Sequence, residues 1–224
     1  MAISKSKVAA LVKALNSADE SAAKAAAKEL DWLLYPNYGP GPRVFTAEES
    51  QRIRDAHYAS LRGSAVLEPV LKAVKEGTPF ARAYALTVLG AAGDPRVMPL
   101  AVEALNDPAR EVRASAARCL FFFRDPATAP ALLQRLDDPD TEVRCAAAST
   151  LGFIQGVDVV PELMALYERS DSESRMAALR ALGQIGDPRS LQLARDALLD
   201  KDKSVRKTAK LALARYDWKR RHGE

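Results

Sequence analysis

The residues best suited to catalysis or metal binding are few in this chain and widely separated. The two histidines, His57 and His222, lie far apart, and Cys119 and Cys145 do not have the spacing of a metal-ligand pair. A nucleophilic triad needs a histidine with partners, and neither histidine has a persuasive one. The GPGP stretch at 39–42 opens no helix, as a phosphate-binding loop would. The sequence therefore predicts no catalytic residue, no metal and no cofactor, although it leaves enzymatic activity open.

The clearest chemical pattern is a row of arginines at one fixed spacing. Each lies 31 residues after the last: Arg82, Arg113, Arg144, Arg175 and Arg206. A guanidinium row could bind anions along a track, or it could hold the structure together, because each side chain offers five donors in a rigid fork. A period in this range indicates an array of repeated units.

Pairs of helices must position this row. From residue 64 on, each repeat contains a helix A and a helix B, and the turns between repeats contain glycine and proline, which end one helix and open the next. The predicted helices cover 64–75, 79–91, 95–105, 108–122, 127–136, 140–154, 159–168, 172–185, 188–199 and 203–218. Because each pair buries little apolar surface alone, stability is expected to come from stacking neighbouring pairs.

The whole chain, 1–224, is predicted to form a single domain. A degenerate first pair covers 5–34, an insertion covers 35–62, regular repeats cover 63–218 and a frayed basic tail covers 219–224. The insertion combines a proline- and glycine-containing loop with a predicted helix over 46–61, and it gathers aromatic residues. It could cap the first repeat or extend a binding surface.

Two repeats in the middle of the chain carry a family resemblance. GDPRVMPLAVEALNDPAREVRASAARCL at 93–120 and DPATAPALLQRLDDPDTEVRCAAASTLG at 125–152 resemble HEAT-like repeats, of the kind also found in the E/F-type phycobilin lyases. The resemblance implies an all-α, right-handed α-solenoid of six helix pairs with an inserted loop and helix after the first. It also implies that the arginine row and the aspartates between helices form a stacking ladder, and that the B helices line the concave surface.

Relatives of this type suggest two enzymatic alternatives. A phycobilin-lyase-like, chromophore-binding enzyme stays open, although nothing in the repeats is specific for a chromophore. HEAT-like DNA glycosylases hold a damaged base with tryptophans on the concave face, whereas the two tryptophans here, Trp32 and Trp218, fall in the end repeats.

The outward positions of the B helices form the predicted binding site. They combine a stripe of small and apolar residues, an acidic row, arginines beside it and aromatic residues toward the N-terminus. This mixture suits a protein or peptide partner, because apolar contacts supply affinity and charges set the register. The candidate residues are Phe80, Tyr84, Arg110, Glu111, Ala114, Arg118, Glu142, Cys145, Glu173, Met176 and Arg180.

The charge is concentrated at one end of the chain. Its formal net charge is +4, but 201–224 contains nine Lys/Arg against three acidic residues. A nucleic-acid-binding protein that uses this basic end is therefore a second hypothesis. No apolar run approaches the length of a membrane span, and two cysteines inside helical patterns indicate packing thiols, so no membrane partner and a cytoplasmic location are expected.

Overall fold

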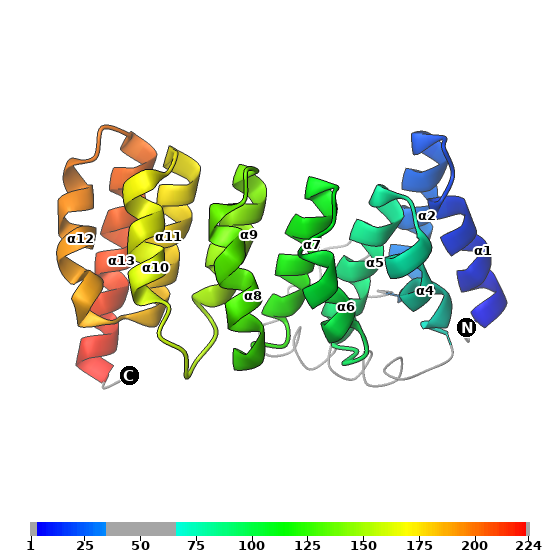
Figure 1. The fold of residues 1–224 in the computed structure, drawn as a ribbon, viewed down its shortest axis with the longest axis horizontal. Helices are drawn as coiled ribbons and strands as arrows, with labels where there is room; N and C mark the ends of the chain where they lie inside the picture. The colour runs from blue at the N-terminus through cyan, green and yellow to red at the C-terminus, as the bar shows by residue number, and fades with distance from the viewer. Residues whose placement is uncertain (1–3, 35–65, 223–224) are drawn as a thin grey trace, which may run out of the picture.

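The computed structural model describes residues 4–34 and 66–222, so the predicted insertion at 35–62 lies outside the described residues. Within the described ranges the chain contains helices and no strand, which confirms the predicted all-α repeat fold. Figure 1 shows the helix pairs side by side in a single row that ends at α13. The A helices are α1 (Lys5–Leu15), α4 (Glu68–Glu76), α6 (Val97–Ala104), α8 (Ala129–Gln134), α10 (Val160–Arg169) and α12 (Leu191–Asp196). The B helices are α2 (Glu20–Leu34), α5 (Pro79–Ala92), α7 (Arg110–Phe121), α9 (Thr141–Leu151), α11 (Ser172–Ile185) and α13 (Lys203–His222).

The turns between repeats use the residues that the sequence pattern predicts. Gly93 and Gly186 end α5 and α11 in the left-handed region, with φ of 63° and 77°. Asp125 and Asp187 then cap the 3-10 turns Pro126–Thr128 and Pro188–Ser190, which lead into α8 and α12. Helix α13 continues past Trp218, where the sequence predicted its end, and residues 219–222 are helical.

The B helices approach one another closely through small residues. A Cβ on Gly152 would lie 2.8 Å from the Cα of Ala181, and a Cβ on Gly183 would lie 2.9 Å from the Cα of Ala212. The A helices pack mainly against their own B helices. The closest contacts between successive repeats therefore run along the B layer, the layer that the resemblance places on the concave side.

The arginine row is a ladder that joins successive repeats and not a free anion track. Arg113 donates from Nε and Nη2 to the two carboxylate oxygens of Asp138, at 2.8 and 2.9 Å. Arg82 holds Asp107 in the same bidentate way, with both distances 2.8 Å. Each carboxylate also accepts a backbone N–H in its own turn. Charged groups removed from water need this complete pairing, so these rungs fix how one repeat sits on the next.

The rung at Arg144 differs from its neighbours. Arg144 donates to the carboxylate of Asp171 and to the hydroxyls of Ser174 and Thr141. Burial raises the pKa of Asp171, but the N–H of Ser174, Arg144 and the Ser174 hydroxyl outweigh it and hold the pKa at about 2. The Asp171 side chain is 40% exposed, whereas that of Asp138 is 2% exposed. The carboxylate that pairs with Arg144 is therefore more exposed to solvent than the carboxylate that pairs with Arg113.

The hydrophobic core runs along the array and contains leucine columns such as Leu89, Leu120 and Leu151, all fully buried. Cys119 belongs to this core, and both cysteines are free thiols. Burial raises the pKa of the Cys119 thiol to about 12, so this thiol stays protonated and packs as a small apolar group.

Candidate functional site

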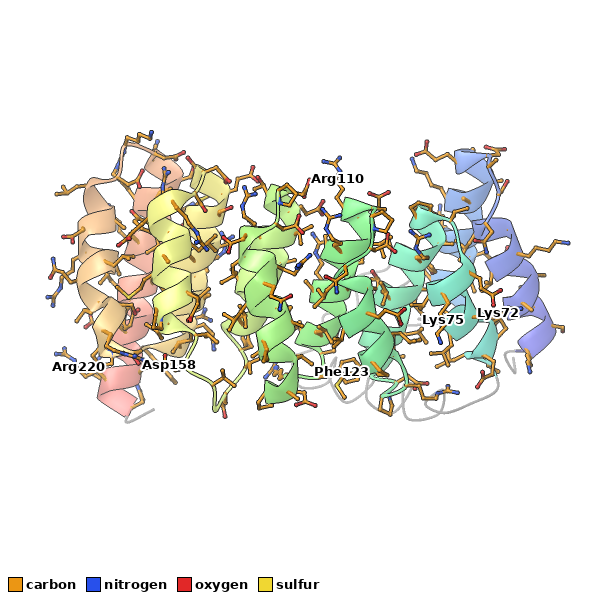
Figure 2. All side chains as sticks on the ribbon, viewed as in Figure 1. Lys72, Lys75, Arg110, Phe123, Asp158 and Arg220 are labelled. Carbon is orange, nitrogen blue, oxygen red and sulfur yellow. The ribbon has the colours of Figure 1, made fainter. Side chains whose placement is uncertain are left out.

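The B-helix face is the surface formed by the exposed positions of α5, α7, α9 and α11. Glu111, Glu142 and Glu173 are exposed and occupy the same place in the first turns of α7, α9 and α11. They therefore form one acidic row across the middle of the array, as the sequence predicts. Arg110 beside this row and Phe123 lie at opposite edges of the array (Figure 2).

A second row, two helical turns further along, contains Arg118 and Arg180, both exposed. Arg118 donates to Glu142 at 2.6 Å, so this pair bridges α7 and α9. The side chains of Glu111, Glu173 and Arg180 form no hydrogen bond or ion pair with a residue of 4–34 or 66–222. The face therefore offers unpaired charges of both signs that the array does not use to hold itself together.

The small and apolar stripe predicted beside the acidic row is a packing seam. Ala114 is fully buried, which contradicts its assignment as a surface residue. Cys145 and Met176 are partly buried and pack against the core. The physical reason is the close approach of neighbouring B helices, which covers the position next to the acidic row.

Cys145 lies close to several charged groups of α11. Burial raises the pKa of its thiol, and the nearby carboxylates of Asp171 and Glu173 raise it further. A thiol in these surroundings stays protonated at neutral pH and is a poor nucleophile. Its place in the seam is structural.

The three remaining predicted residues divide between surface and structure. Phe80 is 36% exposed at the start of α5. The hydroxyl of Tyr84 lies 2.6 Å from Asp31 Oδ1 and 2.9 Å from the carbonyl oxygen of Ala27, so Tyr84 ties α5 to α2 and is not a free recognition residue. Arg110 donates to Asp140 at 3.1 Å but keeps most of its side chain in solvent.

An aromatic patch on the same face was missed by sequence reasoning. Phe122 and Phe153 lie four residues after Arg118 and Ser149, at the C-terminal ends of α7 and α9, and Phe122 is 51% exposed. The rings of Phe121 and Phe153 meet edge to face, 5.0 Å apart, and the Arg124 guanidinium lies 5.3 Å from both ring centres. The signal was present, because extending the helical spacing by one more turn from Arg118 reaches Phe122.

Arg124 reaches this position through an unusual backbone conformation. Its φ of 51° places it in the left-handed region, where the equivalent turns have Gly93 and Gly186. An arginine is strained there relative to glycine, and its side chain gains cation–π contacts in exchange. The aromatic patch (Phe121, Phe122, Phe153 and Arg124) is therefore an apolar surface with a fixed positive charge.

No three His, Cys, Asp or Glu side chains of 4–34 and 66–222 gather in a way that could hold a metal ion. No helix in these ranges is both long and apolar enough to cross a membrane. His57 lies outside the described residues.

Comparisons with known proteins agree with this geometry. The family model for HEAT repeats matches residues 67–139 and 129–214. No curated protein sequence matches the chain. An engineered protein of solved structure has 22% identity and a TM-score of 0.60, and the match covers 94% of this chain and 96% of that one.

Two further solved structures are similar in fold. The complex of CpcE and CpcF of phycocyanin lyase from Nostoc sp. has 24% identity and a TM-score of 0.58, with 89% of this chain and 73% of that one covered. A designed armadillo repeat protein in complex with a (KR)4 peptide has 16% identity and a TM-score of 0.58, with 93% and 99% covered. At these identities the similarity shows the fold alone.

Proposed function

This chain belongs to the HEAT-repeat family, and on that basis we propose that it is a non-enzymatic module that binds a protein or peptide on its B-helix face. The observation that carries the proposal is the acidic row of Glu111, Glu142 and Glu173. It is in register on three successive helices, and two of its three carboxylates have no partner among the described residues. Carboxylates kept exposed and aligned in this way are free to pair with an incoming chain.

The spacing of the row suits an extended peptide. Neighbouring packed helices lie about 8–10 Å apart. A peptide in the extended polyproline II conformation rises about 3.1 Å per residue and places every third side chain on the same side. Three residues of an extended partner therefore pass over each repeat. A partner with a lysine or arginine at every third position would meet Glu111, Glu142 and Glu173 in turn.

The aromatic patch would supply the apolar contact that charges alone do not give. Phe122 and Phe153 follow the C-terminal ends of α7 and α9, whose first turns carry Glu111 and Glu142, so a partner that spans the length of these helices contacts both. Aromatic side chains and arginine are enriched where binding energy is concentrated. Arg118 and Arg180, between the acidic row and the aromatic patch, would repel a partner that is basic throughout, which favours a partner with both basic and acidic residues.

Two similar structures support protein binding as a use of this architecture. The designed armadillo protein is in complex with a peptide, and CpcE is in complex with CpcF. Both share only the fold with this chain. They support a protein partner in general, whereas the proposal that this partner carries basic residues rests on the acidic row.

A charge reversal with a matched control tests the proposal. The site variant carries Glu111→Lys, Glu142→Lys and Glu173→Lys. The control carries the same change of charge on exposed glutamates of the A helices: Glu103→Lys, Glu162→Lys and Glu168→Lys. Both proteins are first shown by circular dichroism and thermal melting to keep the wild-type fold, and then compared in pull-downs from native lysate with mass spectrometry.

The proposal predicts that the site variant loses the protein partners retained by the wild type, while the control keeps them. If both variants retain the same proteins, the B-helix face is not the binding site. If the material retained by the wild type is nucleic acid that moderate salt releases, the basic C-terminal end should replace it as the site.

A further inference from the structure

The last arginine of the ladder has no carboxylate partner. Arg206 of α13 donates from Nη1 to the carbonyl oxygens of Asp200 and Lys201, at 2.7 and 3.0 Å. Arg113 donates in the same way to the two equivalent carbonyls of its own turn, at 2.9 and 3.1 Å. The backbone therefore holds both guanidiniums in the same orientation.

The two arginines differ in what lies beyond the guanidinium. In Arg113, Nε and Nη2 bind both carboxylate oxygens of Asp138 in the next repeat. In Arg206 the same two N–H groups have no acceptor within 4–34 or 66–222. The Nε and Nη2 groups of Arg206 are thus held in a fixed orientation without an acceptor, and their geometry matches that of a carboxylate. We refer to these two groups as the open fork of Arg206.

The surface around this fork occupies the place where another repeat would pack. Lys210 stands in the column of Leu179, which is fully buried, and Ala214 stands in the column of Gly183, which packs on Ala212. Both are exposed on α13. Leu199, next to the carbonyl that holds Arg206, is 88% exposed. The α13 end face (Leu199, Arg206, Lys210 and Ala214) therefore combines an open fork, a second cation and apolar surface.

The positive charge around α13 indicates which kind of partner would bind the α13 end face. Residues 201–222 contain nine Lys/Arg and two acids, Asp202 and Asp217. Figure 2 places Arg220, one of the nine, at the same end of the row. A basic surface of this density attracts acidic partners.

We propose that the α13 end face docks an acidic helical segment of another protein, which adds to the array as a further repeat and places a carboxylate on Arg206. In each of the four preceding rungs, arginine meets a carboxylate in the turn that leads into the second helix of the next pair. The partner would repeat that arrangement between chains. This site is separate from the B-helix face and does not depend on its function.

A second copy of this chain fits the end face poorly. In the first repeat, Ser17 takes the place of the ladder aspartate, because its hydroxyl accepts the N–H of Asp19 as Asp138 Oδ1 accepts that of Asp140. Head-to-tail stacking would therefore offer Arg206 a hydroxyl in place of the buried carboxylate. The carboxylate nearest this position, Asp19, is exposed and stands in the column of Asp171, the partner of Arg144 at the less buried rung. The occupant is better sought in a different, acidic protein.

The probe is a synthetic peptide copied from residues 129–154 of this chain with Cys145 replaced by serine. It contains four acidic and two basic residues, including the ladder aspartate Asp138. Binding to the full chain is measured by fluorescence anisotropy of the labelled peptide at low salt. Two full-length variants of α13 keep its charge: Arg206→Lys removes the fork, and Arg215→Lys changes an exposed arginine that has no described partner.

The proposal predicts that Arg206→Lys weakens peptide binding about tenfold, while Arg215→Lys leaves it unchanged. A peptide with Asp138→Asn should bind more weakly to the wild type and respond little to Arg206→Lys. Equal affinity of the two protein variants for the acidic peptide, or no binding at millimolar peptide, overturns the proposal. A 20-base-pair DNA duplex that binds more tightly than the peptide, and equally to both variants, also overturns it and assigns the basic end to nucleic acid.

Discussion

Removing Arg113 should destabilise this protein far more than removing Arg144, although both are rungs of the same ladder. Arg113 and its partner Asp138 have side chains that are 13% and 2% exposed, and the pair is bidentate. The Arg113→Ala variant removes both hydrogen bonds of the bidentate pair and leaves the buried Asp138 carboxylate with Arg135 alone, 3.8 Å away, which costs about 3–5 kcal/mol. Arg144→Ala leaves Asp171 in partial contact with water, with the N–H and hydroxyl of Ser174 still bound, so about 1–3 kcal/mol is expected.

Urea unfolding followed by far-ultraviolet circular dichroism measures these differences, provided that the slope with denaturant is the same for all variants. Arg118→Ala is the control, because Arg118 and Glu142 are 50% and 55% exposed and such pairs contribute about 0–1 kcal/mol. The double variant Arg113→Ala/Asp138→Asn should regain part of the stability, since it removes the uncompensated charge. Losses of the same size for Arg113→Ala and Arg118→Ala would refute the reasoning that burial makes the rungs structural.

Three further predictions concern packing, pH and thiol chemistry. Gly152→Ala should lower the free energy of unfolding by about 1–3 kcal/mol in the same assay, because the added Cβ meets the next helix. Gly156→Ala should lower it by only about 1 kcal/mol, because its Cβ meets nothing within 4 Å and only the left-handed backbone opposes it. A larger loss for Gly156→Ala than for Gly152→Ala would contradict the close packing of the B helices. The pKa of Asp171 is about 2 in the folded protein against an ordinary 3.8, so its carboxylate stabilises the fold above pH 3.8 and this stabilisation is lost as the pH falls toward 2. Asp171→Asn should flatten the plot of unfolding free energy against pH between these values. An unchanged plot would contradict the lowered pKa. Ellman's reagent at pH 8 should react slowly with Cys145 and still more slowly with Cys119 in the folded protein, and rapid reaction of both before unfolding would show that neither is packed as described.

The repeat fold could be predicted because the same residue types recur at the 31-residue period. A helix pair needs the same apolar spacing, the same turn and the same cap each time, so the leucine columns and the glycine–proline turns return together. The ladder of arginines and inter-helix aspartates followed from the resemblance, whereas the structure assigns the pairs Arg82–Asp107, Arg113–Asp138 and Arg175–Asp200. The different rung at Arg144 could have been expected, because Arg169 stands where the equivalent repeats have an aspartate.

The candidate site was predicted less completely, because helical spacing alone does not say which neighbour covers a position. Ala114 shares a helix face with the acidic row, yet the adjacent B helix buries it. The glycines at 90, 152 and 183 were the available signal, since small residues at one recurring position indicate closely approaching helices. Phe121 replaces glycine in that column, and its ring joins the aromatic patch instead.

A photo-crosslinking pair tests the central claim, that a protein partner binds the B-helix face, most directly. The crosslinking residue p-benzoylphenylalanine is placed at Ser149, exposed in the middle of that face, or at Gln134, exposed on helix A of the same repeat. Irradiation in native lysate is followed by mass spectrometry of the adducts. The account predicts defined protein adducts from Ser149 and none of these from Gln134. Adducts of equal yield and identity from both positions, or nucleic-acid adducts alone, would contradict it.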